Sequence, residues 1–291
     1  WLLLRIGIIA TAPIVLLVVA IRPIVLLRFG TMRSDRIGHF AAETEAYLCD
    51  RDRQKFNGKT VVDVIVCPEP VCNRQLRVMW ARTLRITPVA WLWTLLDHAC
   101  LFWTHSNMHH VQFRIPDCRL FMTTTPYLIF NDEEHRRGQA LLQELGIPSD
   151  ASWVCIHNRD SAYLNKALSG HNWDYHNFRD FRVQNMVAAA EELSRRGYYV
   201  VRLGSIVEEA LTSPDPKIVD YANSPLRSDF MDIYLLAHGA FFLGSDSGLF
   251  FVPLIFRKPI SIVNYTALSE FYRRDYEPWL IILKYHWHRE K

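Results

Sequence analysis

Short apolar runs alternate along this chain with longer segments in which apolar residues recur every three or four positions. The short runs are rich in β-branched residues, as in buried parallel strands, and the longer segments have the spacing of amphipathic helices. In the first half this pattern predicts strands at 23–30 and 61–70 and helices at 36–54, 74–104 (interrupted at Pro88) and within 125–150. Such alternation is typical of a parallel α/β sheet with helices on both faces.

A second series of the same kind begins near residue 151. It predicts strands at 152–160, 198–205, 217–222, 240–248 and 258–265, with helices at 177–197 and 228–239. We therefore predict two Rossmann-like domains that face a cleft, an acceptor-side domain over 23–148 and a nucleotide-sugar-binding domain over 149–270. The hinge is placed at 146–152, and a helical segment is expected at 271–291. In such sheets, ligands bind beyond the carboxyl ends of the strands.

The first 22 residues stand apart from both series. Between Arg5 and Arg22 lie 16 uncharged residues, just short of the roughly 18 that indicate a membrane-spanning helix. We predict a hydrophobic anchor helix over residues 1–22, either embedded in the membrane or lying on it, with a buried core helix as the alternative. By the positive-inside rule Arg22 then lies on the cytosolic side. This places the protein at the cytoplasmic face of the inner membrane.

Composition narrows the class of protein. Of the 291 residues, 50% are hydrophobic and 22% are charged, so the chain is globular. The net charge of +3 comes from scattered lysines and arginines, which argues against nucleic acid as a partner but leaves small anionic ligands open. The six cysteines include no CxxC pair, which indicates reduced thiols in a cytosolic setting.

The strongest candidate for chemistry is a break in an apolar stretch, GSDSG at residues 244–248. A turn from strand to helix leaves backbone N–H groups that bind phosphate, and glycine lets a phosphate approach the backbone closely. The candidate phosphate contacts here are Ser245, Asp246, Ser247 and Gly248. An ordinary helix cap is the alternative interpretation, because serine and aspartate are common caps.

Two more strands of the second half also end in polar loops, IHNRDS at 156–161 and VRLGS at 201–205. Each contributes an arginine, and a guanidinium can bind phosphate through two hydrogen bonds. Salt bridges are the alternative role for both arginines. The candidate donor-binding residues from these loops, and from SPLRSDFMD further on, are His157, Arg159, Asp160, Arg202, Gly204 and Arg227.

Several longer stretches, among them RIGHFAAETEAYL, HNRDSAYL and DYANSPLRSDFMDIYLLAHGAFFLGSDSGL, resemble a bacterial glycosyltransferase family of the GT-B fold. That family is distantly similar to the lipopolysaccharide heptosyltransferases. The resemblance implies transfer of a hexosyl or deoxyhexosyl group from a nucleotide-sugar donor to a glycan or lipid-linked acceptor in surface polysaccharide biosynthesis. It implies an inverting, metal-independent reaction with no cofactor besides the nucleotide-sugar substrate.

The resemblance also assigns roles to particular residues. Asp246-Ser247-Gly248-Leu249 is similar to the Asp-Thr-Gly-Leu helix start that holds the donor phosphates in heptosyltransferases, with serine in place of threonine. Where those enzymes carry a catalytic Gly-Asp after the first strand, this chain has Gly38-His39. We predict His39 as the general base, because histidine titrates near neutral pH. Asp35 and Glu43 stand nearby as substitutes, and a structural histidine at a helix start is the alternative.

Three interpretations of function stay open from the sequence. A sugar-nucleotide epimerase of the same fold would share the phosphate site, and a non-catalytic binding subunit of a glycan assembly complex would lack the base. WTHSNMHH at 103–110 has histidines at metal-binding spacing but lacks the glutamate of HExxH. A surface or acceptor-facing cluster is therefore favoured there over a metal site.

Overall fold

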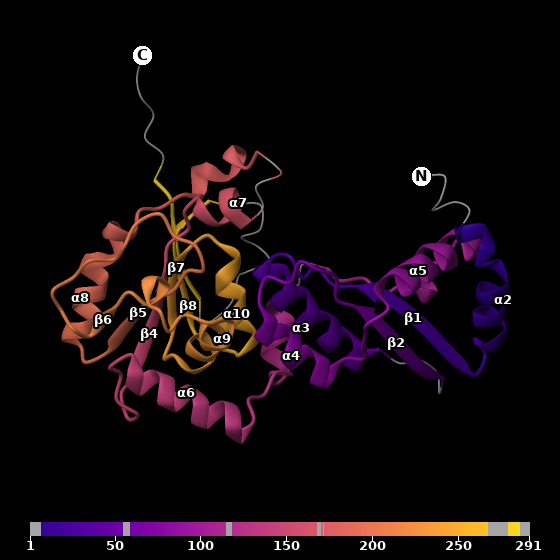
Figure 1. Cartoon of the computed structure of the whole chain (residues 1–291), viewed down its shortest axis with the longest axis horizontal. Helices are drawn as coiled ribbons and strands as arrows, with labels where there is room; N and C mark the ends of the chain where they lie inside the picture. Colours follow the sequence, from indigo (N-terminus) through magenta and orange to yellow (C-terminus); the bar gives the residue numbers. More distant parts are fainter. Residues whose placement is uncertain are drawn as a thin grey trace, which may run out of the picture. The chain divides into compact units, whose positions relative to one another are not determined.

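The computed structural model describes residues 7–54, 59–114, 118–167, 170, 172–266 and 279–285. The chain divides into two compact units, residues 1–116 (unit 1) and 117–291 (unit 2). Both are mixed α/β with parallel sheets, as the sequence pattern predicted. Figure 1 shows the elements of each unit, coloured along the sequence.

Unit 1 is built on a three-stranded parallel sheet in the order β1-β2-β3. Its strands are β1 (Val25–Thr31), β2 (Thr60–Val66) and β3 (Ile86–Thr87). Its helices are α2 (Ala12–Ile21), α3 (Ile37–Arg53), α4 (Arg74–Thr83) and α5 (Ala90–Thr104), followed by the short 3-10 helix η1 (Asn107–His109). Phe29 of β1 also forms an isolated parallel bridge with His110, which follows η1.

The two faces of this sheet follow from strand alternation, since successive side chains point to opposite faces. Phe29 and Val64 pack with Leu96 of α5 and with Val15 and Val18 of α2 in one core cluster. The neighbouring positions Arg28 and Asp63 are turned to the other face, where Tyr47 of α3 donates a hydrogen bond to the Asp63 carboxylate.

The N-terminal helix α2 is apolar all round, and one side of it belongs to the core of unit 1. Val15 and Val18 are only 3% and 5% exposed, whereas Leu16 and Leu17 are 69% and 63% exposed. Over the described part of the chain, no helix has both the length and the apolar character that crossing a membrane requires.

Unit 2 holds a six-stranded parallel sheet in the order β6-β5-β4-β7-β8-β9. Its strands are β4 (Trp153–His157), β5 (Tyr199–Arg202), β6 (Ile218–Val219), β7 (Phe242–Ser245), β8 (Ile260–Tyr265) and β9 (Trp279–Leu283). Its α-helices are α6 (Asp132–Glu144), α7 (Ala162–Ala167), α8 (Val187–Arg195), α9 (Asp229–His238) and α10 (Phe251–Ile255). The 3-10 helices are η2 (Cys118–Thr123), η3 (Asp174–Arg179), η4 (Val183–Met186), η5 (Tyr221–Asn223) and η6 (Gly248–Phe250).

The division between the units falls at residues 116 and 117, earlier than the hinge expected at 146–152. The reason is the packing of α6 on α9, which places the predicted last helix of the first domain in unit 2. A Cβ atom added at Gly138 would lie 2.2–2.4 Å from ring atoms of Tyr234. Glycine at this position therefore lets the two helices approach closely.

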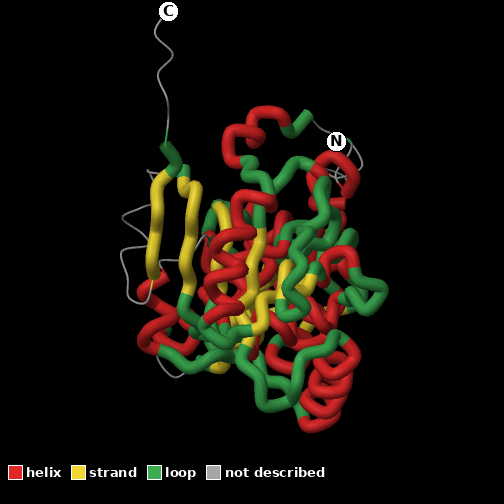
Figure 2. Tube along the Cα trace, turned by 90° about the vertical axis from the view of Figure 1, so that its left-hand side faces the viewer, coloured by secondary structure: helices red, strands yellow, loops and turns green. Residues whose placement is uncertain are grey.

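The carboxyl-terminal segment differs from the helix expected at 271–291. Its described part, residues 279–285, contains the edge strand β9, which pairs with β8 in parallel. Figure 2 shows this strand beside its neighbour, close to the C-terminus. The Trp-Leu-Ile-Ile-Leu sequence is compatible with a strand, and the edge of β8 supplies the backbone groups with which it pairs. The local sequence does not reveal this pairing.

Candidate functional site

The carboxyl ends of three neighbouring strands carry the predicted donor-binding residues. β5, β4 and β7 lie side by side in this order and run in parallel, so the loops after Arg202, His157 and Ser245 leave the same edge of the sheet. We call this the carboxyl edge of unit 2. The topology thus confirms that the three polar strand ends flagged in the sequence meet at one edge.

Arg159 is the most informative residue at this edge. It is 94% buried, since only 6% of its surface is exposed, and its Nη1 donates to the carboxylate of Asp180. Its backbone N–H donates to Ser245 Oγ at 2.7 Å, which ties the β4 loop to the end of β7. Its Nη2 has no hydrogen-bond partner within the described residues. Because an unpaired buried donor is costly, this nitrogen is a candidate contact for a ligand that supplies an acceptor, and Nε of Arg179 and Nε of Arg202 likewise lack partners among the described residues.

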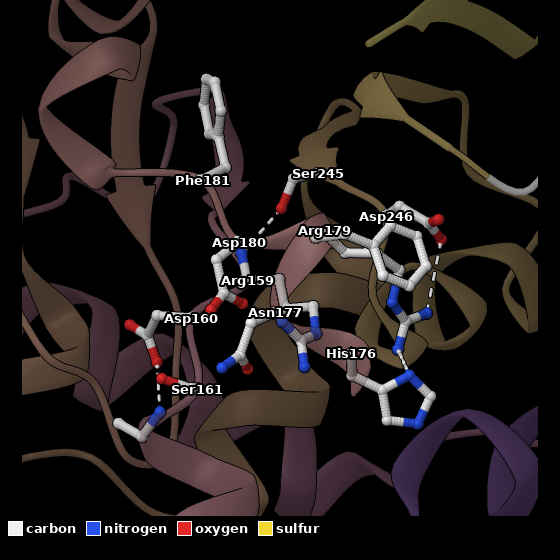
Figure 3. Close-up of polar contacts among 12 residues, drawn as sticks. Arg159, Asp160, Ser161, His176, Asn177, Arg179, Asp180, Phe181, Ser245 and Asp246 are labelled. Atoms are coloured by element: carbon white, nitrogen blue, oxygen red, sulfur yellow. Dashed lines mark hydrogen bonds and ion pairs between the residues drawn. The ribbon is translucent and has the colours of Figure 1, made fainter. Parts of the chain in front are cut away.

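A second arginine, Arg179 of η3, lies beside the first (Figure 3). Burial and, to a smaller extent, the neighbouring Arg179 cation together lower the pKa of Arg159 to about 10. Two guanidiniums that repel each other in a partly buried place are stabilised by an anion between or beside them. Arg179 donates to His176 Nδ1 at 3.2 Å and lies 3.9 Å from an Asp246 oxygen. Arg179 was not among the residues predicted from the sequence to bind the donor.

Asp246 is held in place and only 3% exposed. Its Oδ2 accepts a hydrogen bond from Thr266 Oγ1 at 3.0 Å, and its other oxygen faces Arg179. Asp246 therefore orients the guanidinium of Arg179, and it would affect an anion site through that arginine and not by direct contact. Thr266 at the end of β8 was missed by sequence reasoning, because nothing in the sequence connects it to the turn at residue 246.

The helix start expected after GSDSG is shorter than the sequence suggested. Ser247 caps the 3-10 helix η6, accepting from the Leu249 N–H at 3.3 Å, and Gly248 begins that helix. The α-helix that follows, α10, has only five residues. Such a short helix contributes little to a phosphate site, and the arginines are the main evidence for an anion.

The contacts of Arg202 indicate a structural role. It is fully buried, and its guanidinium donates to Asp220, to Asn158 and to the Glu209 carbonyl, each at 3.1 Å. This arrangement favours the ion-pair alternative over phosphate contact. Asn158 in turn donates to the Phe181 carbonyl at 2.9 Å, so Arg202 supports the loop that carries Arg159.

Other predicted residues at this edge also hold the loops. Asp160 accepts from the backbone N–H groups of Ala162 and Glu208, both at 3.1 Å. A Cβ atom at Gly204 would lie 2.4 Å from Val207, so packing alone requires glycine there. Arg227 pairs with Asp232 at 2.8 Å, and burial raises the pKa of Asp232 to about 6.

His157 is kept neutral at the end of β4. Its Nδ1 lies 3.0 Å from the Leu203 carbonyl, so this nitrogen donates and Nε2 is left as an acceptor. Burial lowers its pKa to about 4, with the Arg202 and Arg159 cations adding to the effect. A neutral imidazole can accept a hydrogen bond here but does not contribute positive charge to an anion site.

This histidine and His238 make the stability of unit 2 sensitive to acid. Burial also lowers the pKa of His238 to about 4, helped by His135 and Lys258. Both histidines therefore bind protons more readily in the unfolded chain, and the free energy of unfolding should fall as pH drops from 6.5 toward 4. Each contributes at most about 1.4 kcal/mol per pH unit. Asp232 opposes part of this loss, because its raised pKa favours proton uptake by the folded state.

Chemical denaturation across this pH range measures the effect. His238→Phe should flatten the pH dependence by about one proton, whereas His98→Gln, which alters an exposed histidine on α5 of unit 1, should leave it unchanged. An unaltered slope in His238→Phe would contradict the assigned pKa shift.

The predicted base, His39, lies in the first turn of α3 in unit 1. Its Nδ1 is 2.7 Å from Glu43 Oε1, with 24% of the histidine side chain and 3% of the glutamate side chain exposed. Arg33 also reaches the Glu43 carboxylate, at 3.4 Å. A buried carboxylate that holds Nδ1 fixes the ring and leaves Nε2 for proton transfer, as a base requires. Glu43, named as a substitute base, is thus placed as the partner of His39.

Two of the three histidines of WTHSNMHH have separate hydrogen-bond partners. His109 Nδ1 lies 2.7 Å from the Leu27 carbonyl, and His110 Nδ1 lies 2.8 Å from Asp97. Nowhere in the described ranges do three or more His, Cys, Asp or Glu side chains form a group that could hold a metal ion. Independence of metal stays a prediction.

Comparison with known proteins gives no family assignment. No protein-family model matches the chain, and no curated protein matches it. Among solved structures, it is similar to the Escherichia coli ADP-heptose lipopolysaccharide heptosyltransferase II, with 10% identity, 88% of this chain and 90% of that chain covered, and a TM-score of 0.48.

Two further solved structures show the same kind of likeness. A glycosyl transferase of family 9 from Veillonella parvula is 9% identical, with 81% and 80% of the two chains covered and a TM-score of 0.46. The E. coli heptosyltransferase WaaC, solved with ADP-2-deoxy-2-fluoro heptose, is 12% identical over 88% of this chain and 92% of that chain, with a TM-score of 0.39. These proteins belong to the class that the sequence resembles, but no TM-score reaches 0.5, so none of them decides the activity of this chain.

Proposed function

We propose that this protein is a glycosyltransferase of the GT-B type that moves a hexosyl or deoxyhexosyl group from a nucleotide-sugar donor to a glycan or lipid-linked acceptor. The observation that carries the proposal is the unpartnered Nη2 of buried Arg159, beside Arg179, at the carboxyl edge of a parallel α/β sheet. The diphosphate of a nucleotide-sugar supplies acceptor oxygens and negative charge together. The Asp246-Ser247-Gly248-Leu249 motif lies at the same edge and supports this choice.

His39 is proposed as the general base for the acceptor hydroxyl, with Glu43 as its positioning residue. Inversion at the anomeric carbon follows from a single displacement, in which the base takes the hydroxyl proton as the oxygen attacks and the nucleoside diphosphate departs. The arginines at the carboxyl edge of unit 2 would stabilise the charge that develops on this leaving group. This mechanism requires no metal ion. We propose that its product is used in the biosynthesis of surface polysaccharide.

The fate of the donor separates the proposed activity from its two alternatives. The full chain is incubated with a panel of nucleotide-sugars in the absence of acceptor, and the products are resolved by anion-exchange chromatography. A glycosyltransferase leaves the donor intact or hydrolyses it slowly to nucleoside diphosphate and free sugar. Conversion to an isomeric nucleotide-sugar would instead establish an epimerase. Binding of the donor without any turnover, even with membrane extracts as acceptor, would favour a non-catalytic subunit.

Association with the cytoplasmic face of the inner membrane is also proposed. Helices α2 and α5 pack together (Figure 1). Trp103 Nε1 of α5 also donates to the carbonyl of Ile8, which precedes α2, at 3.1 Å. Both helices expose large apolar side chains, namely Ile14, Leu16, Leu17, Trp91, Phe102 and Trp103, and so does Ile9 just before α2. Apolar helices that carry tryptophan can lie in the headgroup region of a bilayer without crossing it.

Flotation with vesicles made of E. coli polar lipids tests this proposal. The double substitution Leu16→Glu and Leu17→Glu should release the full chain from the vesicles, because each charge replaces a side chain that is more than 60% exposed. Val78→Glu is the matched control, since Val78 is a half-exposed apolar residue on α4 of the same unit. Undiminished flotation of the double variant would rule out this surface as the contact.

A further inference from the structure

Unit 1 contains a pocket that the proposed transfer reaction does not use. Its volume is about 490 Å³, within the range of small-molecule sites. It lies beside the amino-terminal half of β1, the carboxyl-terminal half of α3 and the segment after η1. Its lining residues are Leu26, Arg28, Tyr47, Asp50, Gln54, Lys59, Asn107, Met108, His110, Val111, Gln112 and Arg114. Neither His39 nor Glu43 lines it.

In the wall of this pocket formed by β1 and α3, the polar side chains of Arg28 and Tyr47 are hydrogen-bonded to groups of the protein itself. Arg28 donates from Nε and Nη2 to the two oxygens of Asp63, at 2.6 and 2.8 Å, and from Nη1 to Gln54 at 2.9 Å. Tyr47 donates to the same aspartate, and burial raises its pKa well above the ordinary value. The Arg28 charge is thus neutralised within the wall, and this network sets the shape of the pocket.

The remaining charges of the lining give the pocket an excess of positive charge. Lys59 and Arg114 are exposed cations, and within the described residues neither forms an ion pair with a carboxylate. Asp50 is the one acidic residue among the twelve that line the pocket. With Arg28 offset by Asp63, two cations and one anion leave a charge of +1, before any contribution from His110.

His110 adds an oriented hydrogen-bonding group to this lining. Asp97 is 7% exposed and lies 2.8 and 3.0 Å from His110 Nδ1 through its two oxygens. With Nδ1 engaged in this way, Nε2 is the ring nitrogen left for a ligand. Leu26, Met108 and Val111 supply an apolar surface in the same pocket.

We propose that this pocket binds a small amphipathic organic anion, with a carboxylate or phosphate group held by Lys59 and Arg114 and an apolar body against Leu26, Met108 and Val111. Cations bind such a group through charge-assisted hydrogen bonds. The site goes beyond the proposed function and does not depend on it, because its lining includes neither His39 nor Glu43 nor any donor-binding residue of unit 2.

Ligand-observed NMR titration of the full chain tests the site with three probes of similar size: benzoate, phenyl phosphate and neutral benzamide. Saturable binding of at least one anion, with benzamide at least about tenfold weaker, is expected. The anion that binds more tightly identifies the carboxylate or the phosphate as the preferred group. Equal binding of benzamide, or no saturable binding of either anion, would overturn the proposal.

Substitutions locate the binding to this pocket. The double variant Lys59→Gln and Arg114→Gln should weaken anion binding about tenfold to a hundredfold. Both side chains are exposed, so the variant should keep the thermal stability of the wild type. Arg85→Gln removes an exposed cation of unit 1 that does not line the pocket and should have no effect. Wild-type affinity in the double variant would place the anion elsewhere and contradict the assignment.

Discussion

Replacing His39 with alanine is expected to lower the turnover of sugar transfer by roughly 10²–10⁴-fold, the usual loss when a general base is removed. The expectation rests on the 2.7 Å contact between His39 Nδ1 and the buried Glu43, which leaves Nε2 to accept a proton. Donor affinity should not change, because the donor-binding residues belong to unit 2. His98→Ala, which alters an exposed histidine of unit 1, is the matched control and should keep full turnover.

Two further variants distinguish a base from a structural histidine. His39→Asp should restore part of the rate and move the acidic limb of the pH–rate profile downward, since an aspartate titrates at lower pH than a histidine. Glu43→Gln should lower turnover less than His39→Ala and shift the same limb, because Glu43 acts only through His39. Near-normal turnover in His39→Ala would exclude it as the base, and Asp35→Ala would then be assayed.

Replacing Arg159 with alanine is expected to weaken the binding of a nucleotide-sugar about tenfold to a hundredfold. Loss of a charge-assisted hydrogen bond costs about 1.5–3 kcal/mol, and the Nη2 group of Arg159 has no other acceptor among the described residues. Asp246→Ala should have a smaller effect in the same direction, since this carboxylate acts by orienting Arg179. Calorimetry on the full chain measures both affinities.

The control for Arg159 separates binding from folding. Removing this arginine also leaves Asp180 without its ion pair, so thermal denaturation must accompany the calorimetry. Arg182→Ala removes a largely exposed arginine near the same edge, one that pairs with Glu209, and should leave donor affinity unchanged. A folded Arg159→Ala variant with wild-type donor affinity would remove the diphosphate assignment.

The order of most strands and helices was predictable because most strands of the two parallel sheets are apolar runs bounded by glycine, proline or polar loops. β3 is an exception, since its two residues lie inside the helix predicted over 74–104. β9 was not predictable, since a five-residue apolar segment becomes a strand only when an edge such as that of β8 is free to pair. The boundary between the units also depends on tertiary packing. Only the structure shows that Gly138 admits the Tyr234 ring and joins α6 to unit 2.

The sequence predicted which loops form the candidate site, but it did not predict the role of each residue in those loops. Arg159 and Arg202 look equivalent in the sequence, each close to the end of a strand. The structure gives the two terminal nitrogens of Arg202 three acceptors and leaves Nη2 of Arg159 without one, while Nε of Arg202 also lacks a partner among the described residues. The contact between His39 and Glu43 could have been inferred from their i,i+4 spacing on a helix. The contact between Thr266 and Asp246 depends on β8 lying beside β7, which spacing does not encode.

The most direct test of the account is a thermal-denaturation screen of the full chain against a panel of nucleoside diphosphates and their sugar conjugates. A ligand that binds only the folded state raises the midpoint of unfolding. The account predicts stabilisation by at least one nucleoside diphosphate, with no stabilisation by the corresponding nucleoside and a reduced shift in Arg159→Ala. If no member of the panel stabilises the wild-type chain, or if the nucleoside alone does so as well as its diphosphate, the assignment of a nucleotide-sugar site to unit 2 is wrong.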